Sequence, residues 1–205
     1  EEGTADIRCT SATCPAQRVR NIIHFVSREA MDLKGFGSVY IEELVSRGFL
    51  NDVADIYTLR DHREKLIKEG IIGKEKNTDK LLSVIEASKE NDADRLLTGL
   101  GIPNVGKSAA KELIEHFSTM DALMAASAEE LAAIKNIGAV IAESVVTWFA
   151  NPLNRELIAR LKEAGLNMEM EALTANENHP FYGKTMVFTG TMPTLDRATA
   201  QTMAQ

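Results

Sequence analysis

Apolar residues recur at steps of three and four through most of the first 168 positions, the spacing of helices that bury one face. Polar residues fill the positions between them. The stripes cover residues 19–26, 40–45, 53–59, 81–87, 93–100, 107–117, 123–134, 141–149 and 157–161. The pattern therefore predicts a mainly α-helical fold.

Short turns interrupt these stripes at four places, and in each case a new helix is predicted directly afterwards. They are Gly35 to Gly37, Gly70 to Lys74, Gly101 to Gly106, and Asn136 to Gly138. Asn136 stands where the other turns carry their first glycine, and asparagine is the non-glycine residue that best tolerates positive φ. Spacing of roughly thirty to forty residues indicates an internal repeat. We predict tandem helical hairpins, four in number.

Each hairpin has the features of an anion site. Glycines such as Gly101 and Gly106 permit positive φ and close approach of another backbone. The first N–H groups of the second helix lack intrahelical partners and carry the positive end of the helix dipole, so a DNA phosphate fits there without base readout. The candidate DNA-binding residues are Gly35, Gly37, Gly70, Gly73, Lys74, Gly101, Gly106, Lys107, Asn136 and Gly138. The alternative, that the hairpins only pack a core and the basic turn at Lys74 is merely solvated, stays open.

The third turn carries a second candidate chemistry. Gly101 to Ser108 matches G-x-x-x-x-G-K-S, the Walker A pattern of nucleotide-binding loops. That pattern requires a buried strand before it and a helix after it. The helix is predicted over 107–117, but Ala93, Leu96 and Leu100 before the turn have helical spacing. We therefore favour a hairpin over an enzyme that hydrolyses nucleotides.

The two ends of the chain differ from the helical middle. Cys9 and Cys14 could supply two ligands of a tetrahedral zinc site, which needs four; no second pair follows, so half a zinc ribbon and two free thiols remain equally open. Residues 169–180 are polar and irregular, which indicates a linker. Lys184 to Gly190 predicts a short buried strand ending at a glycine turn, and residues 196–205 begin a helix.

Charge limits how the chain can meet nucleic acid. The formal net charge of −7 argues against a protein that coats nucleic acid by bulk electrostatics. Any DNA contact must therefore come from local geometry. No apolar run has the length of a membrane span and no signal peptide opens the sequence, so we expect no membrane partner.

Taken in order, these pieces resemble the C-terminal half of the bacterial NAD-dependent DNA ligases. The resemblance rests on the cysteine segment 8–17, on Phe25 to Asp32, on Leu100 to Gly106, and on Phe181 to Thr191. One departure is that the second turn, Gly70 to Lys76, has its glycines displaced from the family's usual Gly-Phe-Gly.

The resemblance implies a domain plan. Residues 1–18 would be the second half of a four-cysteine zinc finger with Cys9 and Cys14 as ligands. Residues 19–168 would be a helix-hairpin-helix DNA-binding domain with halves 19–90 and 91–168. The linker 169–180 would lead to a truncated α/β BRCT opening over 181–205. A strand without its neighbours exposes unpaired backbone groups, so we expect this part either to be disordered or to cause self-association.

The resemblance also implies a function. The family seals nicks in duplex DNA during replication and repair, using NAD and magnesium, by passing AMP from a lysine to the 5′ phosphate. No K-x-D-G motif occurs here, so this fragment resembles the clamp that grips the minor-groove backbones and should be inactive alone. The parent enzyme would be a monomer in the bacterial cytoplasm, at the nucleoid. The alternative is a helix-hairpin-helix module of another DNA repair or recombination protein.

Overall fold

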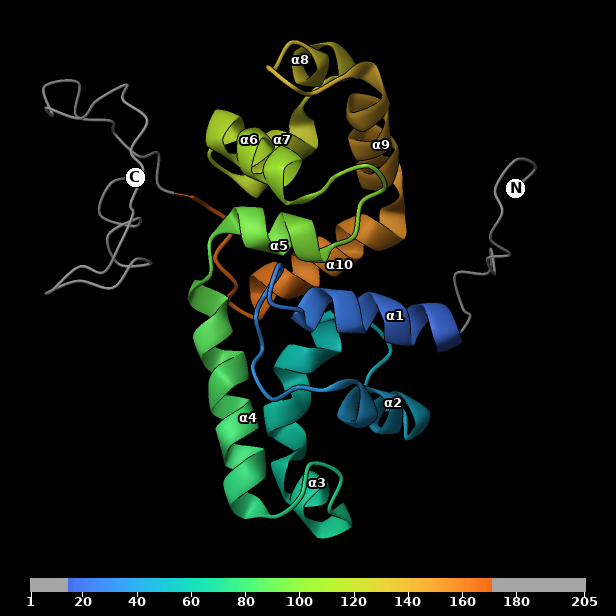
Figure 1. Cartoon of the computed structure of the whole chain (residues 1–205), viewed down its shortest axis with the longest axis vertical. Coiled ribbons are helices and arrows are strands. Elements are labelled where there is room, and N and C mark those ends of the chain that lie inside the picture. The colour runs from blue at the N-terminus through green and yellow to red at the C-terminus, as the bar shows by residue number, and fades with distance from the viewer. Residues whose placement is uncertain (1–14, 171–205) are drawn as a thin grey trace, which may run out of the picture. The chain divides into compact units, whose positions relative to one another are not determined.

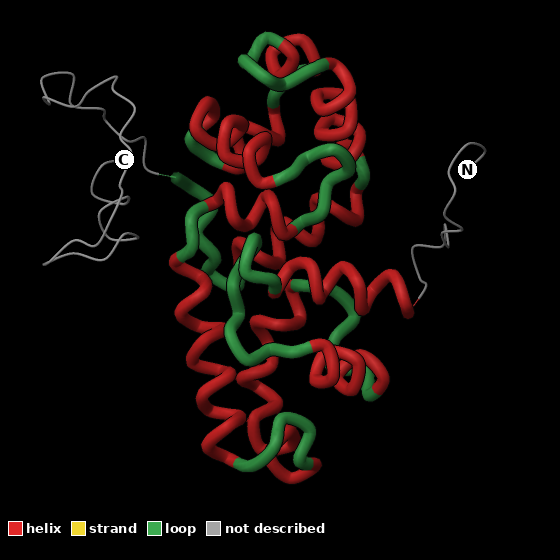
Figure 2. The backbone as a smooth tube through the Cα atoms, viewed as in Figure 1, coloured by secondary structure: helices red, strands yellow, loops and turns green. Residues whose placement is uncertain are grey.

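The structure, a computed structural model, describes residues 15–170. Within that range the regular elements are helices, and the one strand-like pairing is an isolated bridge between Thr119 and Glu169 (Figures 1 and 2). The predicted mainly α-helical fold is confirmed for these residues. The α-helices are α1 Pro15–Val26, α2 Ser38–Ser46, α3 Arg63–Glu69, α4 Glu75–Ala87, α5 Ala93–Gly99, α6 Lys107–Phe117, α7 Met120–Ala125, α8 Ala128–Ala132, α9 Ala139–Ala150 and α10 Pro152–Glu163; η1 Ala54–His62 and η2 Ser88–Glu90 are 3₁₀ helices.

The predicted apolar stripes are the buried faces of these helices. In α6, for example, Ala110, Leu113 and Ile114 are fully buried, while the opposite face is polar. The stripe over 53–59 forms the 3₁₀ helix η1, which contacts α3, α4 and α10 and buries Ile56, Tyr57 and Leu59 among them. Residues from each of the ten α-helices of 15–170 and from η1 join one continuous apolar core.

A helix–turn–helix pair occurs at each of the four predicted turns. The pairs are α1–α2, α3–α4, α5–α6 and α8–α9, and the two helices of each pair contact one another. The first and third pairs meet through α1 and α5, where the Phe25 ring lies 3.0 Å from the position that a Cβ on Gly99 would take. Across the same contact His24 Nε2 lies 2.9 Å from the carbonyl oxygen of Thr98. Close packing thus explains Gly99, while His24 is exposed and lies at the rim of this contact.

The stretch after α10 returns to the helices. The Asn167 N–H donates to the Lys89 carbonyl at 2.8 Å, and the Glu169 carbonyl accepts from the Ala93 N–H at 3.2 Å. The Met170 N–H donates to the Ser118 carbonyl at 3.0 Å. Residues 169 and 170, assigned to the linker from their polarity, are therefore attached to the helical body. Their pairing is long-range and runs through the backbone, so composition gives no sign of it.

Several predictions fall outside the described residues. Cys9 and Cys14, the rest of the predicted linker, the strand over 184–190 and the BRCT opening all lie there. Within 15–170, no three histidine, cysteine, aspartate or glutamate residues gather closely enough to hold a metal ion. In the same range, no helix has the length and apolarity needed to cross a bilayer.

Candidate nucleic-acid interface

Three of the four turns have the same backbone geometry. They are turn 1 (33–36), turn 3 (102–105) and turn 4 (134–137), and in each the last N–H donates to the first carbonyl, at 3.1, 3.0 and 3.1 Å. The third residue has positive φ in every case: 87° at Gly35, 65° at Asn104 and 64° at Asn136. A tight turn with a left-handed third residue favours glycine or asparagine there. The prediction that Asn136 adopts positive φ is confirmed, and Asn104 is its equivalent in turn 3.

A buried side chain anchors each of these turns. The fourth residue points into the core, leaving Phe36, Val105 and Ile137 only 4%, 7% and 3% exposed. The two middle residues of each turn are exposed to solvent. The turns are therefore held from inside, and their tips face outward.

A glycine follows each of these turns and forms the N-cap of the next helix. Gly37, Gly106 and Gly138 have φ of −75°, −90° and −83° with extended ψ, and a Cβ at any of them would meet nothing within 4 Å. Of the two glycines expected to permit positive φ, Gly101 adopts it and Gly106 does not, and Asn104 is the other residue of this stretch that does. Neither backbone conformation nor packing requires glycine at these N-caps. What the missing side chain does provide is open access to the helix start.

The helices that follow begin without side-chain caps. Glycine supplies none to α2, α6 or α9, and within 15–170 the N–H groups of their first two residues have no acceptor. Three other helices do have side-chain caps: Thr119, Ser127 and Asn151 accept N–H bonds at the starts of α7, α8 and α10. The starts of α3, α4 and α5 have no side-chain cap either, but their N-cap residues carry side chains. At the three turns the bare, positively polarised amides thus lie behind a glycine, with no N-cap side chain beside them.

The capped helices show what is absent at the turns. Ser127 and Glu130 form a capping box, with the Ser127 N–H donating to Glu130 Oε2 at 2.8 Å. That hydrogen bond lowers the pKa of the Glu130 carboxyl. A negative group is thus stabilised at this helix start by the chain itself, whereas no carboxylate of residues 15–170 accepts from the first N–H groups of α2, α6 or α9.

Lysines lie beside the bare helix starts. Lys107 is the first residue of α6, and Lys34 and Lys135 each lie three residues before an N-cap glycine. All three are exposed; Lys34 lies 3.6 Å from Asp32, and Lys107 and Lys135 form no ion pair with any residue of 15–170. Sequence reasoning missed Lys34 and Lys135, although a lysine directly before the residue with positive φ was a usable signal.

Turn 2 (70–73) is built differently. Its closing bond, from the Gly73 N–H to the Gly70 carbonyl at 3.2 Å, has the same register, but positive φ occurs at its two ends, 66° at Gly70 and 105° at Gly73. The middle residues Ile71 and Ile72 are buried rather than exposed. The N-cap of α4 is Lys74, which carries a side chain where the other turns have glycine.

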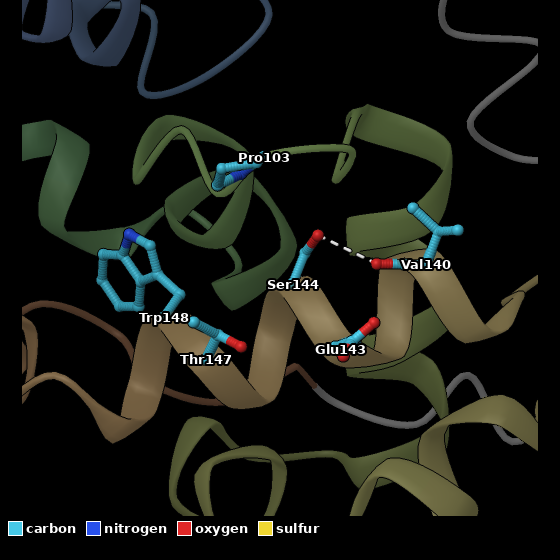
Figure 3. A pocket seen from close by; sticks show the side chains of 6 residues that line it. All are labelled: Pro103, Val140, Glu143, Ser144, Thr147 and Trp148. Atoms are coloured by element: carbon cyan, nitrogen blue, oxygen red, sulfur yellow. Dashed lines mark hydrogen bonds between the residues drawn. The ribbon is translucent and has the colours of Figure 1, made fainter. Parts of the chain in front are cut away.

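The Walker A interpretation is wrong. The helix α5, and not a strand, leads into Gly101, so the pattern lacks the context that gives it meaning. A recess of about 300 Å³ beside this stretch lies between Pro103 and α9 (Figure 3). It is lined by Pro103, Val140, Glu143, Ser144, Thr147 and Trp148, none of them cationic, which does not suit a nucleotide's phosphates.

Comparison with known proteins agrees with this geometry. Residues 95–158, which hold the third and fourth hairpins, match the family described as "Helix-hairpin-helix motif". The chain is 43% identical over 205 residues to a DNA ligase of Clostridium kluyveri, 45% over 205 residues to one of Heliobacterium modesticaldum, and 41% over 204 residues to one of Symbiobacterium thermophilum. Each alignment covers 100% of this chain but only 31%, 30% and 30% of the relative. The chain is therefore homologous, over its whole length, to a segment that makes up about three tenths of bacterial DNA ligases.

Proposed function

We propose that this chain is the DNA-gripping segment of an NAD-dependent ligase that seals nicks in duplex DNA. The observation that carries the proposal is the set of three N-cap glycines, Gly37, Gly106 and Gly138, that neither the backbone nor the packing requires. A phosphate oxygen can approach the bare N–H groups behind each glycine, because no side chain stands in front of them. The similarity to bacterial DNA ligases and the matched helix-hairpin-helix motif support DNA as the ligand.

Binding of this kind is independent of base sequence. Main-chain N–H groups and lysines contact phosphates, which are the same at every step of the duplex. The contacts would follow the two backbones that border the minor groove, and bases would not be read. The net charge of −7 fits this local mode, because repulsion over the rest of the surface keeps DNA off it.

The chemistry of nick sealing would lie outside these 205 residues. We propose that NAD, magnesium and the lysine that carries AMP belong to another part of the ligase, and that this segment holds the nicked duplex for it. Cys9 and Cys14 would supply two thiolates of a tetrahedral zinc site, completed by two ligands from outside this chain. We retain the predicted boundaries as part of the proposal: a zinc-finger half over 1–18, the binding domain over 19–168, and a BRCT opening over 181–205.

Fluorescence anisotropy with labelled nicked duplexes tests the binding part. We expect two duplexes of unrelated sequence to bind with equal affinity, and salt to weaken both with a shallow slope, since few lysines take part. If log affinity fell steeply with log salt concentration, and did so equally for duplexes and single strands, binding by bulk electrostatics would be indicated instead. Absence of duplex binding would overturn the proposal.

A chimera tests the ligase part. The matching segment of the Clostridium kluyveri ligase would be replaced by this chain, and sealing of a nicked duplex would be measured with NAD and magnesium. Sealing that depends on the inserted segment is expected, with an insert carrying Gly37→Val, Gly106→Val and Gly138→Val as the matched control. A chimera that folds and forms its AMP adduct but does not seal would favour the alternative, a helix-hairpin-helix module of another repair or recombination protein.

A further inference from the structure

Two side-chain hydrogen bonds connect the third and fourth hairpins. Asn104 Nδ2 in turn 3 donates to Ser144 Oγ on α9 at 2.9 Å, and Asn136 Nδ2 in turn 4 donates to Glu112 Oε1 on α6 at 3.0 Å. Each hairpin thus offers an asparagine from its turn to the second helix of the other. Figure 3 shows Ser144 on α9 facing the segment that contains Pro103.

The two bonds are equivalent in register. Each asparagine lies two residues before its N-cap glycine, and each partner lies six residues after the N-cap glycine of the opposite hairpin. Both asparagines have positive φ, so the turn conformation itself directs the side chains outward. An exchange of this kind is what approximate two-fold symmetry between the hairpins produces. In turn 1 the equivalent residue is Gly35, which has no side chain to offer.

Glu112 adds a reason to regard the contact as specific. One of its carboxylate oxygens, Oε2, is buried without a partner, while Oε1 accepts the bond from Asn136. A half-buried carboxylate is unfavourable unless hydrogen-bonded, and Asn136 supplies the donor. The bond therefore also fixes the side chain of α6 against the tip of turn 4.

We infer that Asn104 and Asn136 are positioning residues that hold the starts of α6 and α9 at one spacing, so that both meet phosphates of the same duplex together. The inference rests on the proposed function. Two sites held at the correct spacing bind a rigid duplex far better than two that move independently, because the second contact becomes intramolecular. Both bonds are exposed, so each contributes little to the stability of the fold.

The spacing can be measured without DNA. Spin labels at Glu115→Cys and Glu143→Cys, on exposed faces of α6 and α9, would be placed in a chain with Cys9→Ser and Cys14→Ser, and their distance distribution recorded by pulsed electron paramagnetic resonance. Asn104→Gly with Asn136→Gly removes both bonds and keeps positive φ available. We expect the distribution to widen or shift in this variant. An unchanged distribution would overturn the inference.

The consequence for binding separates positioning from general stability. A flexible single strand can adapt to an altered spacing and a duplex cannot, so the double variant should lose about fivefold or more in duplex affinity and change less than about twofold for a single strand. Glu112→Gln keeps the acceptor and should match the wild type, whereas Glu112→Met, which removes the same charge, should behave like Asn136→Gly. Failure of the wild type to bind duplex would overturn the proposed function. If the double variant lost duplex affinity and single-strand affinity to the same extent, or lost neither, this inference alone would be overturned.

Discussion

Turn 3 and turn 2 close with the same hydrogen-bond register but present different surfaces. In turn 3 the exposed pair Pro103 and Asn104 forms the tip and Gly106 leaves the next helix start open. In turn 2 the corresponding middle residues are the buried Ile71 and Ile72, and the N-cap is a lysine. A helical hairpin can therefore keep its fold without the open N-cap on which the proposed phosphate binding depends.

The comparison also separates two uses of glycine. Gly35, Gly70 and Gly101 have positive φ and are needed by the chain's own path. Gly37, Gly106 and Gly138 have ordinary extended conformations in open space. Since the chain's own structure does not require the glycines of the second group, only they suggest a binding partner. Turn 2 has no glycine of this second kind.

The largest effect is expected from Gly106→Val. The side chain would stand in front of the α6 amides, and we expect duplex affinity to fall about tenfold, roughly 1.4 kcal/mol. Circular dichroism should show an unchanged helical signal, because a Cβ at Gly106 meets nothing within 4 Å. Gly106→Ala serves as the milder control. Full affinity in the valine variant would remove Gly106 from the interface.

A second test uses the two glycines of turn 1. Gly35→Ala forces a side chain into positive φ and should lower stability by about 1 kcal/mol, seen as a melting temperature about 2–4 °C lower. Gly37→Ala should leave the melting temperature unchanged and weaken duplex binding. Thermal unfolding measures the stability of both variants, and fluorescence anisotropy measures their duplex affinity. A lower melting temperature for Gly37→Ala than for Gly35→Ala, with duplex binding weakened only in Gly35→Ala, would contradict the distinction between the two kinds of glycine.

A smaller loss is expected from Lys107→Ala. One exposed point charge would be removed while the α6 amides stay, so affinity should fall about threefold and the salt slope of log K by about one. Titrations at several salt concentrations measure both. A loss equal to that of Gly106→Val would speak against recognition by backbone amides.

The smallest effect is expected in turn 2. Lys74→Ala should change duplex affinity by less than about twofold, because turn 2 has a buried tip and no glycine at its N-cap, so we expect no close phosphate contact there. Lys135→Ala in turn 4 is the matched comparison, and it should cost more. A larger loss at Lys74 would place turn 2 in the interface and erase the contrast with turn 3.

Most of the helices were predictable because they bury a stripe at a spacing that the sequence displays directly; the short α3, which buries only Leu66, has no such stripe. The turns were located from their glycines, and Asn136 was recognised because few other residues accept positive φ. The conformation of Gly106 was not predictable, because glycine permits many conformations. The sequence does not show which residues of the turn adopt positive φ. Turn 3 places positive φ at Gly101 and Asn104 instead.

Long-range contacts were the other gap. The bonds from Asn104 to Ser144 and from Asn136 to Glu112 join residues far apart in the chain. Nothing local marks Glu112 or Ser144 among the other polar residues on α6 and α9. The buried middle of turn 2 is similar, since Ile71 and Ile72 have no helical spacing that would assign them to the core.

Backbone amide resonances test the central claim most directly. On addition of nicked duplex to labelled protein, the N–H signals of Ser38, Lys107 and Ala139 should move downfield, as expected for new hydrogen bonds to phosphate. The signal of Glu75, at the start of α4, should stay in place. Movement of Glu75 equal to the other three, or movement confined to side chains with these amides unaffected, would contradict the account.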